Sequence, residues 1–583
     1  MTDRFGWLGR FVGMALMGCL AVGCGGSPAA GGPGADGAAG PGADGGALVN
    51  VGAGPWSFTT TPSIPTPADD LTVFAFSQVG TNASDPQVLA LAPDMVMRAW
   101  QAWDGVGTKA SDYNFAYTTA CQAAGIRFIG GSTATAMFQD QWTTDAEFQS
   151  VVTRDASGAP VVHNQILPNL YRGSMANPDY RAYLVAIAKL QIDGGVDGLY
   201  FDEINADYEG ASFDFNEGFD DYHLADFNAF LLARYPGGAG FAAFAGITDD
   251  NLLRGDVPSN DLTHNFNYRR YLATKDWTSS PLTSANPLAA LWGPASTSRA
   301  PATPTNFSDQ AEIYRYWPQI VEELRGYALQ QHGRQLFISA NGLYPFVDFQ
   351  GVGLFDYNGD DGSSAGPGAN YVPTTAAGQL DGTQTLRGPF ASLYTRSAAL
   401  APGAPVVIFL DWPSGPMSRY LALPASQQQD YWRLYAAEAY ASGLYFAFHL
   451  MDTIGDPSAT TLGLMPLFES LTAYYRAHAT LYHHTTPASA TATASLASAT
   501  IATWDQTSPN RRLVHVVNHE YAGAIQPQTG VTVAIPSATP PQSVTLASPD
   551  LAADSPLPFT YAAGQIGVTL PTLEAYDVVV VGY

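Results

Sequence analysis

Short apolar segments, separated by longer helical or irregular stretches, recur along this chain and constrain its fold more than any other feature. Short apolar runs bounded by turn signals are typical of buried strands, and helices between such strands are typical of a parallel sheet. Eight of these segments therefore predict an α/β fold, a (β/α)8 TIM barrel. They are Leu71–Phe76, Met95–Trp100, Ile126–Ile129, Val196–Phe201, Leu336–Ala340, Val352–Phe355, Val406–Leu410 and Gly443–Phe448.

Local signals predict helices between several of these strands. Asn177 followed by a proline is a good N-cap with a first-turn proline, and it predicts a helix over Asn177–Ile192. A second helix is predicted over Ser426–Ala441, with Gly443 just beyond its end. A third is predicted over Ser308–Gln331, with a kink at Pro318.

These signals divide the chain into domains. The barrel is predicted to cover residues 61–482, with an insertion after the fourth strand at about 205–332, because this connection is far too long for one helix. Beyond Tyr482, alternating apolar residues without helical signals predict a C-terminal antiparallel β-sandwich over residues 483–583. Its expected strands are Leu513–Asn518, Val531–Ile535, Val544–Leu546, Ile566–Leu570 and Val578–Val581.

The N-terminus has the pattern of a bacterial export signal. Arginines precede a short apolar run over Phe11–Val22, and small residues with Cys24 follow it. Residues 1–24 therefore predict a lipoprotein signal peptide with Cys24 as the lipidated residue, Cys19 being a second possible site. Residues 25–60, rich in Gly, Ala and Pro, predict a disordered tether. We expect an exported cell-envelope lipoprotein, or an extracellular protein if the signal is cleaved without lipidation, that meets the membrane only through this anchor.

Charge and motif content exclude several classes of function. The net charge of −26 argues against nucleic acid as a partner and suits a neutral ligand such as a carbohydrate. No HExxH motif is present, the Gly-rich stretches do not follow a predicted strand as GxGxxG, and no Gly-x-Ser-x-Gly elbow supports a serine hydrolase. The segments near Asp214 and Asp356 match the spacing of a calcium-binding loop only in part. Cys121 is predicted to be a buried, unreactive thiol. No metal and no cofactor are therefore expected.

Polar side chains occur where the predicted strands end, and those ends meet at one face of a barrel, where its chemistry takes place. They are Asp202, Glu203, Asn341, Asp356, Asp411, His449 and Asp452. Aromatic residues suited to stacking on sugars lie beside the same ends: Trp100, Trp103, Tyr344, Tyr357 and Trp412. Two opposed carboxyl groups are what glycoside hydrolysis requires. We therefore interpret the acids as catalytic candidates, and Asn341, His449, Asp452 and the aromatic residues as candidate sugar ligands.

The segment Gly195-Val-Asp-Gly-Leu-Tyr-Phe-Asp202 resembles the fourth-strand motif of barrel glycoside hydrolases of the α-galactosidase and dextranase groups. The C-terminal segments Leu513–Asn518, Val544–Asp550 and Tyr576–Val580 are similar to the tail of dextranases and cycloisomaltooligosaccharide glucanotransferases. The resemblance implies that Asp202 is the nucleophile and that Asp356, in place of the glutamate of dextranases, is the acid/base. It implies a secreted enzyme that cleaves a neutral poly- or oligosaccharide with retention of configuration.

Two alternatives remain open. Cellulase-like barrels end the fourth strand in Asn-Glu, so Glu203 could serve as acid/base with Asp411 as nucleophile. A barrel that has lost turnover would instead be a non-catalytic carbohydrate-binding surface lipoprotein. Transfer of the sugar to an acceptor other than water is a further variant of the same chemistry, since it differs only in the exclusion of water.

Overall fold

The structure is a computed structural model of the chain. It describes residues 71–76, 85–97, 105–163, 169–202, 217–247, 266–293, 306–307, 316–340, 353–355, 372–400, 405–409, 416–450 and 458–583.

Eight parallel strands form the central sheet, in the order β7-β6-β3-β2-β1-β10-β9-β8. Cα atoms of β7 and β8, the two ends of this order, approach within 8 Å of each other, so the sheet curls into a closed ring. The predicted (β/α)8 barrel is confirmed, and each predicted strand overlaps an observed one. The strands are β1 (Phe74–Phe76), β2 (Met95–Met97), β3 (Arg127–Thr133), β6 (Gly198–Asp202), β7 (Phe337–Ala340), β8 (Gly353–Phe355), β9 (Val406–Ile408) and β10 (Tyr445–His449).

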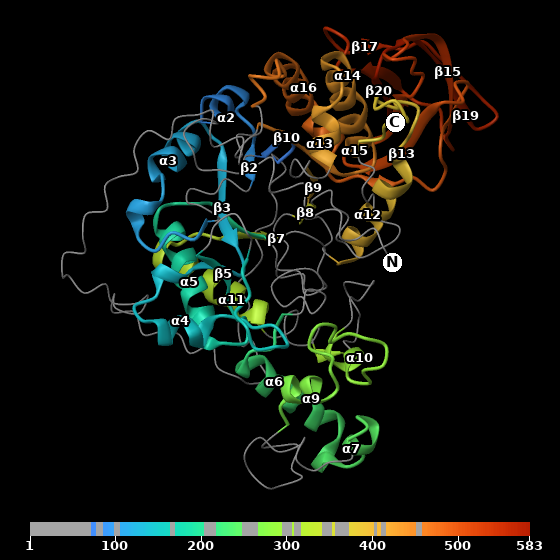
Figure 1. The fold of residues 1–583 in the computed structure, drawn as a ribbon. Helices are drawn as coiled ribbons and strands as arrows, with labels where there is room; N and C mark the ends of the chain where they lie inside the picture. The colour runs from blue at the N-terminus through green and yellow to red at the C-terminus, as the bar shows by residue number, and fades with distance from the viewer. Residues whose placement is uncertain are drawn as a thin grey trace.

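Helices surround this sheet (Figure 1). Local chemistry explains their ends: the Asn177 side chain accepts a hydrogen bond from the Asp179 N–H at the start of α5, and Gly443, with φ +78°, follows the last helix before β10. That last helix, predicted as one piece, runs through α14, the π-helical η10 and α15. The described helices that connect barrel strands or follow β10 are α2 (Asp85–Leu91), α3 (Phe115–Ala123), α5 (Pro178–Asp193), α11 (Trp317–His332), α12 (Arg387–Leu400), α13 (Pro416–Leu421), α14 (Ala425–Tyr431), η10 (Trp432–Ala436), α15 (Ala437–Ala441) and α16 (Met465–Ala477).

The kink at Pro318 stays a prediction, because the chain on its N-terminal side lies outside the described residues. Pro318 lies in the first turn of α11, where its missing N–H removes no intrahelical hydrogen bond. Residues 308–315, where the helix was predicted to begin, lie outside the described part of the chain. Within the described ranges, every helix is too short or too polar to cross a lipid bilayer.

Two excursions leave the barrel on either side of β6. The first, between β3 and α5, was not anticipated and holds the hairpin β4 (Ala136–Phe138) and β5 (Leu170–Arg172) with α4 (Asp145–Val151). The second follows β6 and holds α6 (Asp221–Arg234), α7 (Phe241–Phe244), α9 (Tyr268–Thr274) and α10 (Ala289–Trp292), drawn in green in Figure 1. Its own core is aromatic, with the Trp292 ring stacked on Phe219 at 4.9 Å and edge-on to Phe227 at 4.7 Å.

The C-terminal domain is an antiparallel β-sandwich, as predicted. Its sheets have the orders β11-β13-β14-β20-β16-β17 and β12-β15-β19-β18, and both bury alternate residues such as Val516, Val533 and Val568. The prediction missed β13, whose sequence is rich in Ala and Thr. The strands are β11 (Thr486–Pro487), β12 (Thr493–Ala494), β13 (Ala499–Thr507), β14 (Asn510–Asn518), β15 (Gln528–Pro536), β16 (Ser543–Ala547), β17 (Ser555–Pro556), β18 (Phe559–Ala562), β19 (Gln565–Leu573) and β20 (Tyr576–Gly582).

The sandwich packs on the barrel through α15. The indole N–H of Trp504 donates to the Ala441 carbonyl at 2.9 Å, and the Trp504 ring meets Tyr394 edge-on at 4.9 Å. Beside this contact, the fully buried Glu438 carboxylate accepts hydrogen bonds from the Thr500 hydroxyl at 3.1 Å and from the His519 ring at 2.9 Å. A buried charge needs such partners, so residues of both domains are required to satisfy Glu438.

Candidate active site

The carboxyl ends of the barrel strands lie at one end of the sheet, with β3 and β6 extending beyond their neighbours: Val96, one residue before the end of β2, pairs with Phe128, five residues before the end of β3. Thr133, the last residue of β3, pairs with Asp202, the last residue of β6, and Phe201 pairs with Ala340 at the end of β7. Phe76 at the end of β1 pairs with both Met97 and His449, the last residues of β2 and β10. Because these strands are all parallel, the backbones of Asp202 and His449 lie at the same, carboxyl end of the barrel.

His449 is only 6% exposed, and its imidazole ring stacks on Phe76 at a centroid distance of 5.0 Å. Phe76 also stacks on Phe409 at 4.3 Å. One face of the imidazole is thus covered by Phe76 and is not open to a sugar. Its role as a sugar ligand stays a prediction.

The structure describes the backbone of Asp202 but little else of the predicted site. Other candidates lie outside the described residues, and so does the predicted leader with Cys19 and Cys24. These candidates are Glu203, Asp356 and Asp411 among the acids, and Trp100, Trp103, Asn341, Tyr344, Tyr357, Trp412 and Asp452 among the sugar ligands.

A glycine-lined contact places β3 directly against β6 below Asp202. Gly131 has φ +125°, and a Cβ added there would lie 1.8 Å from the Tyr200 carbonyl oxygen. The buried Gln191 side chain accepts from the Gly131 N–H at 2.8 Å and donates to its carbonyl at 3.0 Å. The residue after Tyr200, Phe201, packs on Trp317 of α11, with ring centroids 5.3 Å apart. The strand that ends at Asp202 is therefore held on both sides. The Gly130-Gly131 pair was a signal for this contact, and the sequence interpretation did not use it.

Sequence reasoning also missed a buried polar group where the chain re-enters the described structure after β6. We call Thr153, Ser174, Asp220 and His223 the Asp220 cluster. The Asp220 carboxylate accepts from Ser174 Oγ at 2.8 Å, from Thr153 Oγ1 at 3.1 Å and from His223 Nδ1 at 2.6 Å. Burial by itself would raise the pKa of Asp220, but the charge and hydrogen bonds of His223, with that of Ser174, lower it to about 2. Asp220 is therefore ionised at neutral pH.

The residues just before Asp220 are held by the first excursion. Glu217 lies 3.4 Å from the Arg172 guanidinium, and both side chains are buried. The backbone N–H of Gly218 donates to Thr153 Oγ1 at 3.2 Å, and that of Phe219 donates to the Arg154 carbonyl at 2.8 Å. Asp220, the last residue of the segment near Asp214 that partly matches a calcium-binding loop, is thus the N-cap of α6. Among the described residues, no group of three or more His, Cys, Asp or Glu side chains could hold a metal ion.

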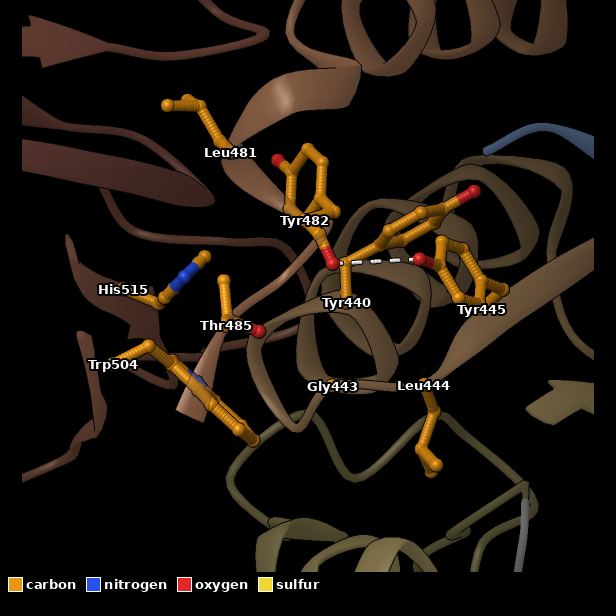
Figure 2. Close-up of a pocket in the computed structure, with 9 residues that line it drawn as sticks. All are labelled: Tyr440, Gly443, Leu444, Tyr445, Leu481, Tyr482, Thr485, Trp504 and His515. Atoms are coloured by element: carbon orange, nitrogen blue, oxygen red, sulfur yellow. Dashed lines mark hydrogen bonds between the residues drawn. The ribbon is translucent and has the colours of Figure 1, made fainter. Parts of the chain in front are cut away.

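A small pocket lies between barrel and sandwich, away from the barrel mouth. Figure 2 shows its lining, in which the Tyr445 hydroxyl donates to the Tyr482 carbonyl at 3.4 Å beside Tyr440, Trp504 and His515. The cavity has a volume of about 10 Å³, which is room for about one water molecule. Burial, assisted by the charge of Arg387, lowers the pKa of His515 to about 3, so this ring is neutral. The pocket is too small for a sugar.

Comparison with known proteins supports the architecture. The sequence matches no protein-family model, and it matches no curated protein sequence. Among solved structures, the chain is similar to a Paenibacillus sp. cycloisomaltooligosaccharide glucanotransferase complexed with cycloisomaltoheptaose, with a TM-score of 0.50, 9% identity, and coverage of 88% of this chain and 85% of that one. A Thermotoga neapolitana maltogenic α-amylase gives a TM-score of 0.45 at 9% identity, over 88% and 100% of the two chains.

The resemblance to barrel glycoside hydrolases is therefore confirmed at the level of the fold.

Proposed function

We propose that this protein is a glycoside hydrolase acting on a neutral poly- or oligosaccharide. The observation that carries the proposal is the position of Asp202, the last residue of the fourth barrel strand, at the mouth of a (β/α)8 ring. The comparison with the glucanotransferase bound to cycloisomaltoheptaose makes an isomaltooligosaccharide or dextran the first substrate to test.

We assign Asp202 as the nucleophile and Asp356 as the acid/base. Asp356 directly follows β8 in the sequence, and β6 and β8 flank β7 in the ring. Two steps of about 4.8 Å between neighbouring strands separate their backbones. Carboxyl groups extending from such positions can converge to the ~5–5.5 Å of a retaining pair.

The competing pair, Glu203 with Asp411, would join β6 to β9, which lie three steps apart around the ring. The seventh-strand nucleophile of cellulase-like barrels is a glutamate, whereas Asp411 is an aspartate, so we favour the first pair. The carboxylates that do not react would then bind sugar hydroxyls or tune the pKa of the reacting pair.

In the proposed reaction, one carboxylic acid protonates the glycosidic oxygen as it leaves, while the nucleophile forms a covalent bond to the anomeric carbon. Water, activated by the same acid/base in its ionised form, then releases the sugar with retention of configuration. If a second sugar replaces this water, the product is a transglycosylated oligosaccharide.

The test compares wild type, Asp202→Asn, Asp356→Asn, Glu203→Gln and Asp411→Asn on dextran and isomaltooligosaccharides, with other α-glucans, galactosides and β-glucans alongside. Loss of an acid/base group costs about 10²–10⁴-fold in rate, and we expect losses of at least this size for Asp202→Asn and Asp356→Asn. Full activity in Asp202→Asn would remove the nucleophile assignment. Saturable sugar binding by a wild type without turnover would favour the non-catalytic alternative.

We further propose that the chain is exported and lipidated on Cys24, which follows the apolar run of the leader. Replacing Cys19 and Cys24 separately and together with serine, followed by fractionation of cells into membrane and soluble material, tests this. Membrane association that survives the double replacement would contradict a lipid anchor.

A further inference from the structure

We propose that the Asp220 cluster is a positioning device for the proposed active site, fixing the far end of the chain that leaves β6 at Asp202. The inference rests on the proposed function. The Asp220 carboxylate accepts more hydrogen bonds than a helix start requires. In addition to the three side-chain donors of the cluster, the backbone N–H groups of Tyr222 and His223 donate to it, at 3.1 and 3.2 Å. A helix N-cap needs one such acceptor oxygen. The additional side-chain bonds therefore serve something besides the start of α6.

The partners of Asp220 come from the first excursion, which is itself tied to the end of β3. The Gly173 N–H donates to the Thr135 carbonyl at 2.7 Å, and the Tyr180 hydroxyl donates to the Ala134 carbonyl at 2.9 Å. Ser174 follows Gly173 directly. A continuous set of hydrogen bonds thus leads from the end of β3 to Asp220.

The same end of β3 holds Asp202, because Thr133 pairs with it in the barrel sheet. The chain leaves this register at Asp202 and is held again from Glu217 to Asp220 on the excursion bonded to residues 134 and 135. Both ends of the connection are therefore fixed to one element. A shift of α6 would therefore displace Ser174 and, through the Gly173–Thr135 hydrogen bond, the end of β3 that pairs with Asp202.

The cluster is fully enclosed, since Thr153, Ser174 and His223 are 0% exposed and Asp220 is 3% exposed. A sugar cannot touch it, so these are positioning residues rather than catalytic ones. The ionised Asp220 beside His223 also makes the anchor sensitive to a change of one atom, because Asp220→Asn keeps the shape but removes the charge.

The experiment measures initial rates on dextran for wild type, Asp220→Asn, Ser174→Ala and the control Asp221→Asn. Asp221 is the next residue, its side chain is 82% exposed and it pairs with Arg269 on the surface, at 2.5 Å. Misplacement by about 1 Å can cost up to about 100-fold in rate. We expect Asp220→Asn to lose about 10- to 100-fold in kcat/KM, mainly in kcat, Ser174→Ala to lose less, and Asp221→Asn to match wild type.

Hydrogen exchange of residues 217–224 in the full chain separates the anchor from the chemistry. Faster exchange in Asp220→Asn, with an unchanged thermal midpoint for the sandwich, is the expected result. Unchanged exchange would refute the anchor whatever the activity. Faster exchange with unchanged kcat/KM would refute the positioning role. If Asp220→Asn does not fold, Ser174→Ala decides by the same two measurements. A wild type inactive on every sugar would overturn the proposed function, and with it this role.

Discussion

Replacing Asp577 with asparagine should stabilise the C-terminal sandwich at neutral pH much more than in acid. Asp577 lies on β20 opposite Val516 of β14 and is 1% exposed. Its Oδ2 has no hydrogen-bond partner among the described residues. Burial, assisted by the charges of Asp550 and Glu574 and opposed by a hydrogen bond from Ser548, raises the pKa of Asp577 from 3.8 to about 7.

The size of this effect on the free energy of unfolding follows from the linkage between proton binding and folding. The folded state binds this proton about three pH units more tightly than the unfolded state, and each unit corresponds to about 1.4 kcal/mol. Because the folded pKa of an acid is raised, the neutral carboxyl contributes its full stability below about pH 4. The contribution decreases from about pH 4 to 7 and is gone above pH 7, a total loss of about 4 kcal/mol.

Asparagine does not titrate, so the advantage of Asp577→Asn over wild type should grow by about 3 kcal/mol from pH 5 to pH 8 and then level off. Thermal unfolding of the full chain, followed through the transition of the sandwich at half-unit steps of pH, measures this difference. Asp505→Asn is the matched control, because Asp505 lies on β13 of the same sheet, its side chain is 35% exposed and it pairs with Arg512. A stability gain for Asp577→Asn that is the same at pH 5 and pH 8 would refute the reasoning.

Two further predictions concern the interface and the barrel. Burial by itself would lower the pKa of His519, but the hydrogen bond and charge of Glu438 outweigh burial, and the pKa is raised. The His519–Glu438 pair should therefore stabilise the contact between the domains fully below about pH 6.5, and this stabilisation should be lost as the pH rises through the folded-state pKa. Limited proteolysis between the domains should accelerate at alkaline pH in wild type, and His519→Gln should be cleaved rapidly even at pH 6; a pH-independent rate in wild type would contradict this. Gly131→Ala, whose Cβ would overlap the Tyr200 carbonyl, should cost several times the roughly 1–2 kcal/mol expected for the open, left-handed Gly333→Ala, measured by urea unfolding. Equal costs for the two glycines would show that β3 and β6 can separate.

Much of the fold could be predicted because parallel strands buried on both faces read as short apolar runs. All eight barrel segments were recognisable in this way, and the cap at Asn177 marked the start of α5 to the residue. Strand ends were less predictable: β3 continues to Thr133 through Gly130 and Gly131, because Gln191 supplies hydrogen bonds there that no local pattern reveals. β13 was missed because alanine and threonine carry little of the apolar alternation on which a strand prediction depends.

The amino-acid sequence by itself determined the order of strands and helices and the residue, Asp202, with which the fourth barrel strand ends. These features depend on neighbours in the chain, through apolar periodicity and capping. Only the tertiary structure decided that Asp220 meets Ser174 and Thr153, and that Asp577 is buried with an unpaired oxygen. Which polar groups share a buried site depends on how distant elements pack, and burial in turn sets their pKa values. Local pattern therefore points to candidate chemistry, while packing selects the groups that hold it in place.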